Sequence, residues 1–255
     1  MTLLIWITTL LVASAAGLLG SFMISKRMTL TAGPLGHLAL PGVAIALFYD
    51  FNVFLGALCF ILFGAVIVWV LKRVSNLPIE ALTGIAFVFG LSLGLLLLPM
   101  EHAEEAIMGD VTKIEMVDFW IALTFSIIVF VIVAKTYKKI IMVTLSEDLA
   151  KTLEVNVKTL DLIFLILVAL VVAMEVKIVG GIMTVALVIL PASIASNVAR
   201  SLKQYLLASP LSGIISASLG LLLYEYTYLP AGPLIVLSLF VFFLISIYLR
   251  KLVNG

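Results

Sequence analysis

Apolar residues fill most of the chain in long runs, which charges, prolines and glycines interrupt at short intervals. A membrane-spanning helix needs about 20 mainly apolar residues to cross roughly 30 Å of hydrocarbon. Cutting the chain at its charged residues and Pro/Gly breaks gives nine segments: 3–25, 33–49, 52–71, 80–99, 118–135, 160–176, 178–198, 205–224 and 231–250. We therefore predict an all-α polytopic membrane protein with a single transmembrane domain over residues 1–255.

Two of the segments contain residues that disfavour a continuous helix. The second segment is short and contains, among others, Gly33, Pro34, Pro41 and Gly42. We predict that it is short or broken, and that Pro41-Gly42 allows a helix break or close packing that helps to gate a channel. The seventh segment begins near Gly180-Gly181 and contains Pro191, so it is a second candidate for interruption. Eight full spans plus one partial span therefore fit the pattern as well as nine.

Basic residues indicate the orientation of these segments. If the N-terminus lies outside and nine segments alternate, all of the 15 basic residues except Lys113 and Lys177 fall on the cytoplasmic side. Cytoplasmic loops of membrane proteins carry an excess of Lys and Arg. We predict a multi-pass protein of the cell (inner or plasma) membrane, with the N-terminus outside and the C-terminus in the cytoplasm.

The composition agrees with this assignment and excludes several other classes of protein. Hydrophobic residues make up 64% of the chain and charged residues 11%, whereas about a quarter of the residues of a soluble domain are charged. The single cysteine, Cys59, excludes a disulfide framework within the chain. The net charge of +1 gives no sign of a nucleic-acid partner.

A hydrophilic stretch at residues 136–159 falls on the cytoplasmic side. Ser146 is a candidate helix N-cap, and Glu147 and Asp148 fall in the first turn, where the helix dipole favours negative charge. Leu149 and Leu153 are four residues apart and share one face. This pattern predicts a short amphipathic helix. The residues alone leave open whether it docks on a partner or lies on the membrane surface or on its own bundle.

A second hydrophilic stretch, residues 100–117, falls on the outer side. It is acidic because it contains Glu101, Glu104, Glu105 and Asp110, and it also carries His102. It is either a solvated loop or an acidic rim that attracts cations or the basic patch of a partner.

Motifs for nucleotide and metalloenzyme chemistry are absent from the sequence. The chain contains no Gly-Lys pair and therefore no G-x-x-x-x-G-K-[ST] phosphate-binding loop, and it contains no H-E-x-x-H. Glu175 and Glu225 fall near segment ends on the outer side, where we expect them to reach water. No string of intramembrane carboxylates is evident, such as an ion-coupled pump would need. The sequence therefore favours a conduit over an enzyme.

His37 is the one ionisable group in the middle of its segment. Intramembrane ionisable groups usually face a bundle interior or an aqueous cavity. A neutral imidazole there could bind a divalent cation transiently. Alternatively, His37 is a buried polar group that donates a hydrogen bond to a backbone carbonyl.

Three blocks of the sequence resemble the permease subunits of metal-ion ABC transporters, the zinc/manganese/iron class. Residues 26–42, KRMTLTAGPLGHLALPG, match the family's block near the start of the chain in Arg27, Met28, Leu30, His37, Leu40, Pro41 and Gly42. Residues 147–161, EDLAKTLEVNVKTLD, resemble its cytoplasmic coupling segment, and residues 179–195, VGGIMTVALVILPASIA, are similar to a third block. Gly109 also sits where family members carry a glycine ahead of the next span.

This resemblance implies a homodimeric channel bound to two cytoplasmic ATPase subunits. An extracellular or periplasmic metal-binding protein would deliver zinc, manganese or iron, and ATP hydrolysis would take place on the partner chains. The segment near 146–156 would be the helix that docks on the ATPase, through Ser146, Glu147, Asp148, Leu149, Ala150, Leu153 and Val155. No permanently bound cofactor is implied.

The sequence departs from the family pattern beside His37. Many members carry an Asp four residues before the histidine and a Ser directly before it, where this chain has Gly33 and Gly36. The Asp/His pair is the family's proposed metal site in the channel, so His37 lacks an anionic partner on its own helix. Zn²⁺ and Mn²⁺ both accept imidazole, but Mn²⁺ relies more on oxygen ligands, so the lone histidine favours zinc.

Other function classes remain as alternatives. An ABC permease of the same fold with a non-metal substrate is motivated by Gly33. A secondary transporter would require inverted repeats and buried carboxylates. A membrane enzyme would need a catalytic cluster, and the sequence shows none.

Overall fold

The computed structural model describes residues 2–26, 32–98, 108–146, 150, 152, 153 and 155–254, and the regular elements in these ranges are all helical. The helices are α1 (Leu3–Ser25), α2 (Ala32–His37), α3 (Ala39–Phe48), α4 (Val53–Val74), α5 (Ile79–Leu97), the 3₁₀ helix η3 (Val111–Lys113), α7 (Met116–Leu145), α9 (Val157–Val198), α10 (Leu202–Thr227) and α11 (Ala231–Asn254). The predicted all-α class is therefore confirmed for the described part of the chain.

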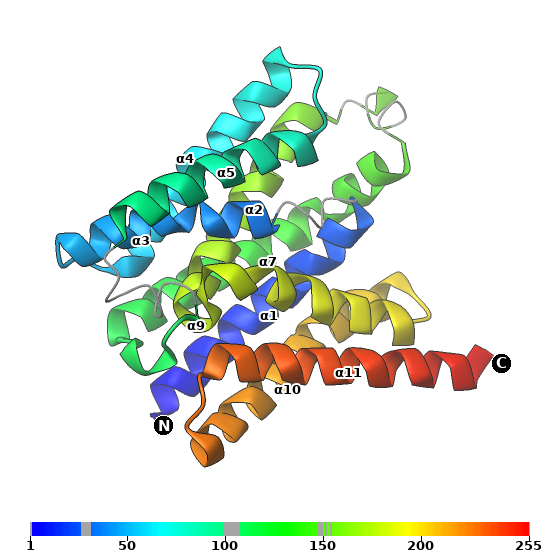
Figure 1. The fold of residues 1–255 in the computed structure, drawn as a ribbon. Coiled ribbons are helices and arrows are strands. Elements are labelled where there is room, and N and C mark those ends of the chain that lie inside the picture. The colour runs from blue at the N-terminus through cyan, green and yellow to red at the C-terminus, as the bar shows by residue number, and fades with distance from the viewer. Residues whose placement is uncertain are drawn as a thin grey trace.

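Six helices are long and apolar enough to cross a membrane, and three shorter apolar helices accompany them. The six are Leu3–Ser25, Val53–Val74, Met116–Thr144, Val157–Gly181, Leu202–Thr227 and Ala231–Lys251, and the shorter ones are Leu35–Phe48, Ala81–Leu97 and Met183–Val198. Each of the nine predicted segments overlaps one of these helices. Figure 1 shows the two termini at opposite ends of the bundle, which agrees with an odd number of alternating crossings. The number of full crossings and their orientation stay predictions.

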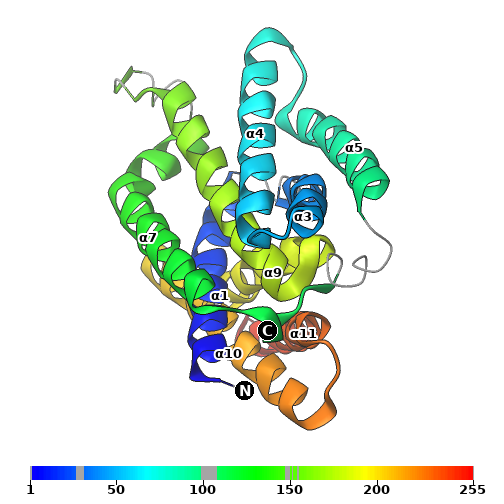
Figure 2. The same ribbon diagram turned by 90° about the vertical axis from the view of Figure 1, so that its left-hand side faces the viewer.

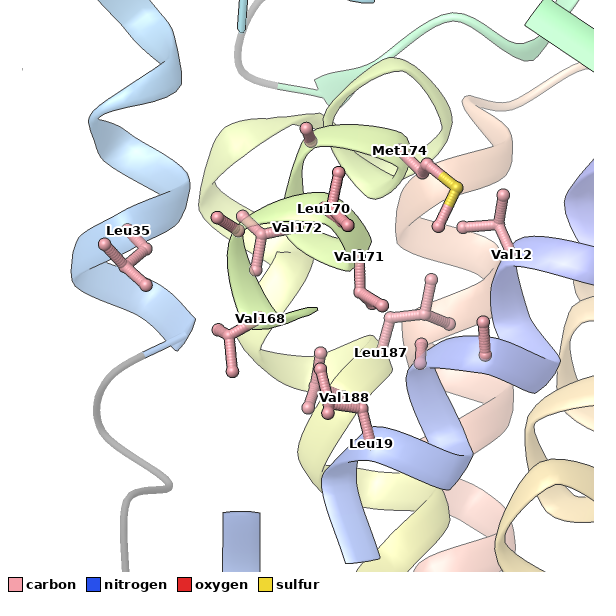
Figure 3. Packing of buried hydrophobic residues seen from close by; sticks show 14 of the residues in the cluster. Val12, Leu19, Leu35, Val168, Leu170, Val171, Val172, Met174, Leu187 and Val188 are labelled. Carbon is pink, nitrogen blue, oxygen red and sulfur yellow. The ribbon is translucent and has the colours of Figure 1, made fainter. Parts of the chain in front are cut away.

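Helix α9 lies at the centre of the molecule. Figure 2 shows α3, α4 and α5 on one side of it and α1, α10 and α11 on the other. In the core, Val12 and Leu19 of α1 lie beside Met174, Leu187 and Val188 of α9 (Figure 3). A lipid-embedded bundle is held together by close packing because lipid tails are as apolar as the helices, and small residues allow close approach. The contact between α1 and α10 follows this rule, since a Cβ added at Gly17 would lie only 2.6 Å from the carbonyl oxygen of Ser209.

The second predicted segment is broken, as expected. Leu38 separates α2 from α3, and its N–H donates to the carbonyl of Leu35, at 3.1 Å, three residues back. Pro41 explains the position of the break, because it has no N–H for the carbonyl of His37 and its ring crowds that carbonyl. Gly42 instead serves close packing. A Cβ at Gly42 or at Gly56 of α4 would clash with the carbonyl oxygen of the other glycine.

Helix α9 consists of two helical halves that meet at Gly180. This residue has φ 76° and ψ 163°, and it is the position inside α9 whose backbone angles are not helical. The interruption predicted for the seventh segment is therefore found at Gly180. The helix continues through Pro191, so the expectation of a break there was wrong. Pro191 packs against α10, where a Cβ at Gly213 would lie 3.7 Å from its ring.

The turn at Gly180 is packed against two other backbone segments. Gly109 also has a positive φ, 72°, and a Cβ there would lie 2.6 Å from the nitrogen of Gly180. The N–H of Asp110 donates to the carbonyl of Lys177 at 3.0 Å. At the start of α11, a Cβ at Gly232 would lie 2.9 Å from the Cα of Val179. The segment before α7, the turn in α9 and the start of α11 thus meet at glycines.

We predict that Gly180→Ala destabilises the protein by about 1–3 kcal/mol, because an L-residue with a Cβ is strained at this φ and ψ. The thermal unfolding of the detergent-purified protein measures this effect. Gly84→Ala is the matched control, since a Cβ at Gly84 in α5 meets nothing within 4 Å and alanine is the better helix former. Equal melting temperatures for the two variants would contradict the assignment of strain to Gly180.

Candidate functional site

His37 is the last residue of α2, directly before the break at Leu38. Its ring is half-buried and contacts Phe87 of α5 edge to face, with ring centroids 4.7 Å apart and an interplanar angle of 71°. Its Nδ1 atom is buried and has no hydrogen-bond partner in the described part of the protein. The alternative that His37 is satisfied by a backbone carbonyl therefore finds no support at Nδ1.

The helix that carries His37 is held tightly on three sides. Next to the histidine, a Cβ at Gly36 would clash with the hydroxyl oxygen of Thr184 and lie 2.8 Å from the carbonyl of Gly181, both on α9. On the other sides, the side chain of Leu38 fills the space left by Gly64 of α4 and Gly90 of α5. The position before the histidine is a glycine rather than the serine of the family pattern because α9 leaves no room for a side chain.

Among the described residues of this single chain, His37 belongs to no cluster of side chains that could hold a metal ion. Gly33, where the family pattern has an Asp, lies within α2. Among the residues that the structure describes, no group of three or more His, Cys, Asp or Glu side chains could hold a metal ion. The candidate ligands of the acidic stretch, Glu101, His102, Glu104 and Glu105, lie outside the described residues.

Glu175 differs from its prediction. We expected this carboxylate to reach water near a segment end, but its exposed fraction is 0% and neither carboxylate oxygen has a hydrogen-bond partner among the described residues. The prediction was wrong because the segment was ended at Lys177, whereas α9 turns only at Gly180 and continues into its second half. Glu175 therefore lies inside the packed part of α9. Glu225 is exposed, as predicted.

Lys177, one of the two basic residues predicted outside, is paired. Its Nζ lies 2.5 Å from Oδ2 of Asp118, which also accepts from the N–H of Glu115 at 2.7 Å. The other oxygen of Asp118 accepts from the side chain of Asn52 at 3.1 Å. This ion pair connects α7 to α9 and to the N-cap of α4. A cavity of about 490 Å³ lies beside it, with both acidic and basic residues in its lining: Asp50, Lys113, Glu115 and Lys177.

In the described part of the segment near 146–156, Ala150 and Thr152 have a helical backbone. Ser146, the C-cap of α7, has an extended backbone, with φ −161° and ψ 118°, and its carbonyl accepts from the N–H of Ala150 at 3.1 Å. Its role as the N-cap of a following helix stays a prediction. Ala150 is buried and Val155 packs on the core, whereas Leu153 is 56% exposed. Glu147, Asp148 and Leu149 lie outside the described residues. Since packing on the bundle leaves Leu153 uncovered, this side chain is available to a partner.

The structure also brings together three charged residues that the sequence analysis did not single out, Lys26, Lys72 and Asp161. We term this cluster the basal clamp. The carboxylate of Asp161 in α9 accepts from Nζ of Lys26 at 2.7 Å and from Nζ of Lys72 at 2.8 Å. The sequence marked Asp161 only as the last residue of the block 147–161 that resembles the family's coupling segment. No local spacing connects it to lysines 89 and 135 residues away.

Comparisons with known proteins agree across nearly the whole chain. Residues 1–250 match the ABC 3 transport family. The manganese import system permease protein ScaB of Streptococcus gordonii is 29% identical over 95% of this chain and 89% of its own length. The high-affinity zinc uptake system membrane protein ZnuB of Buchnera aphidicola is 26% identical over 94% of this chain and 95% of its own length. The solved structure of PsaBC from Streptococcus pneumoniae in complex with Fab superposes with a TM-score of 0.84 at 28% identity, covering 98% of this chain and 94% of that one.

We predict that Glu175→Gln leaves the melting temperature of the purified protein unchanged or raises it. An ionised carboxylate without a partner is costly to bury, and the neutral amide has nearly the same shape. Asp118→Asn is the control, since it removes a carboxylate that is paired, leaves Lys177 without its partner and should lower the melting temperature. A loss in Glu175→Gln as large as that in Asp118→Asn would mean that a bound cation stabilises the Glu175 carboxylate.

Proposed function

This chain belongs to the ABC 3 transport family, and we propose that it is the membrane-spanning permease subunit of an ABC importer that carries a divalent transition metal ion. The match covers nearly the whole chain, and relatives of similar length are named as permeases for manganese and zinc. The subunit would form only the channel. ATP hydrolysis would take place on a partner chain, since the sequence has no phosphate-binding loop.

The observation that carries this proposal is the state of His37. A half-buried imidazole with an unpartnered nitrogen, at a helix break inside an apolar bundle, has a lone pair or a proton to offer to a passing ligand. A neutral imidazole is a good ligand for divalent transition metals. The remaining ligands would come from water or from a second copy of the chain, because the described residues of one chain bring no carboxylate cluster to His37.

The assembly would follow from this role. We propose a homodimer with two cytoplasmic ATPase subunits, which dock on the segment near 146–156, and an extracellular or periplasmic metal-binding protein that delivers the ion. The exposed side chain of Leu153 supports the docking surface. The break at Leu38 lies two residues after Gly36, and the break at Gly180 lies four residues before Thr184. Since Gly36 and Thr184 are in close contact, both breaks are candidate hinges for gating around His37.

The metal itself is the finer part of the proposal. A site with an imidazole and no nearby carboxylate favours zinc, because Mn²⁺ prefers oxygen ligands. Manganese is the second candidate, since ScaB, at 29% identity, is named for manganese import. An ion-coupled secondary transporter is the remaining alternative. Glu175 is a candidate to serve it, since among the buried carboxylates of the described chain it is the one without a hydrogen-bond partner.

We predict that His37→Ala strongly reduces metal uptake by the reconstituted complex and leaves its assembly intact, because the side chain has one ring contact and no hydrogen bond at Nδ1 to lose. Uptake of radioactive zinc and manganese into proteoliposomes, with size-exclusion chromatography of the complex, measures both effects. Thr124→Ala is the control, since this exposed hydroxyl bonds only to a carbonyl of its own helix. Uptake by His37→Ala equal to that of the control would reject the role of His37.

We predict that zinc outcompetes manganese in the same assay when the two ions are present at equal concentration. The order of divalent affinities at a nitrogen ligand places zinc above manganese. Preferential uptake of manganese would show that oxygen ligands dominate the site. Uptake driven by an ion gradient without ATP, and abolished by Glu175→Gln, would instead identify a secondary transporter.

A further inference from the structure

The basal clamp is a partly buried charge cluster near the start of α9. The side chain of Asp161 is 12% exposed, and its two oxygens are divided between two lysines from different helices. Lys26, the C-cap of α1, is 7% exposed and also lies 4.9 Å from the ring centroid of Phe164. Lys72, in the last turn of α4, is 39% exposed. One carboxylate therefore connects α1, α4 and α9.

A second contact reinforces the connection between α4 and α9. The indole N–H of Trp69 in α4 donates to the carbonyl of Lys158 in the first turn of α9, at 3.2 Å. The guanidinium of Arg73 stacks on the same indole at 3.5 Å from the ring centroid. The end of α4 is thus fixed to the start of α9 by an ion pair and by a hydrogen bond, which lie three residues apart on each helix.

Asp161 of the basal clamp comes, in the sequence, shortly after the segment proposed to dock on the ATPase. The N–H of Val155 donates to the carbonyl of Ala150 at 3.0 Å, and α9 begins two residues later, at Val157. Asp161 lies only five residues after Asn156, the N-cap of α9. The first turns of α9 are a stiff helix, so we expect a displacement of the docking segment to move Asp161 as well.

The two lysines of the basal clamp each belong to a part of the chain that connects to the helix carrying His37. On one side, α2 begins six residues after Lys26. On the other, α4 carries Gly64, where the side chain of Leu38 packs next to His37, and Gly56, where the backbone meets Gly42 of α3. The helix that carries His37 is thus reached from Asp161 both along the chain and through α4.

We propose that Asp161 is a positioning residue that transmits movement of the cytoplasmic docking segment to the His37 helix, through Lys26 and Lys72. This inference rests on the proposed function and adds to it a residue whose side chain is held by two lysines of neighbouring helices. A buried ion pair contributes little net stability compared with apolar residues of similar size. The two lysines and one carboxylate therefore serve to define one relative position of three helices.

Two readouts on the complex with its ATPase test this transmission. The first is metal uptake per ATP hydrolysed in proteoliposomes. The second needs no metal: His37→Cys in a Cys59→Ser background is labelled with a thiol reagent, with and without trapped nucleotide. In Asp161→Asn, uptake per ATP should fall by at least about fivefold, a typical coupling between sites. The effect of nucleotide on the labelling rate should disappear, while basal ATP hydrolysis persists.

Matched variants separate transmission from folding. Asp161→Glu should restore both readouts, because the carboxylate reaches the same lysines. The triple variant Lys26→Met, Lys72→Met, Asp161→Asn removes the charges together, so it should fold well but stay uncoupled. Wild-type coupling in the triple variant or in Asp161→Asn would overturn the proposal. One outcome would reject the proposed function but not the role of Asp161. In it, the wild-type complex takes up no metal, while nucleotide still changes the labelling rate of His37→Cys and this change is lost in Asp161→Asn.

Discussion

The turn at Gly180 is the constraint on which the arrangement of the helices depends. Helix α9 lies between the helices on the two sides of the molecule, and its backbone is interrupted at Gly180 (Figure 2). An interruption between two apolar helices leaves backbone groups without helical partners, and lipid offers them none. Here the carbonyl of Lys177 accepts from Asp110, and Gly109 and Gly232 let two further backbones cover the turn. These close contacts need residues without a Cβ, so glycine at these positions is a requirement of the packing.

Around this centre, buried polar groups fall into two kinds. Asp118 and Asp161 are fully engaged, each with lysine and with donors from neighbouring helices, and they fix helix ends to one another. Glu175 and the Nδ1 atom of His37 are buried and have no hydrogen-bond partner within the described ranges. The first kind defines positions, because several contacts determine each side chain. The second kind is available for a ligand or a proton, because nothing in the described chain has satisfied it. A transport path needs both kinds, rigid ends and unsatisfied groups between them.

Much of the site could be predicted from sequence. His37 stood out as an ionisable group within an apolar run, and the break beside it followed from Pro41, because proline removes a helix hydrogen bond wherever the helix lies. The missing carboxylate at Gly33 was also visible. The paired state of Lys177 and the burial of Glu175 could not be foreseen. Both depend on how far α9 continues before its interruption at Gly180. The position of a charged residue in the sequence does not reveal where the helix is interrupted.

The sequence by itself determined which segments are helical and apolar, since hydrophobic length and helix-breaking residues act locally. It also determined that the chain has no phosphate-binding loop of its own and that it resembles a metal-ion permease. Only the tertiary structure decided which helices meet. The approach of Gly36 to Thr184, the pairing of Asp161 with Lys26 and Lys72, and the isolation of Glu175 arise from residues far apart in the chain. Their contacts depend on helix register and crossing, which the pattern of one segment does not contain.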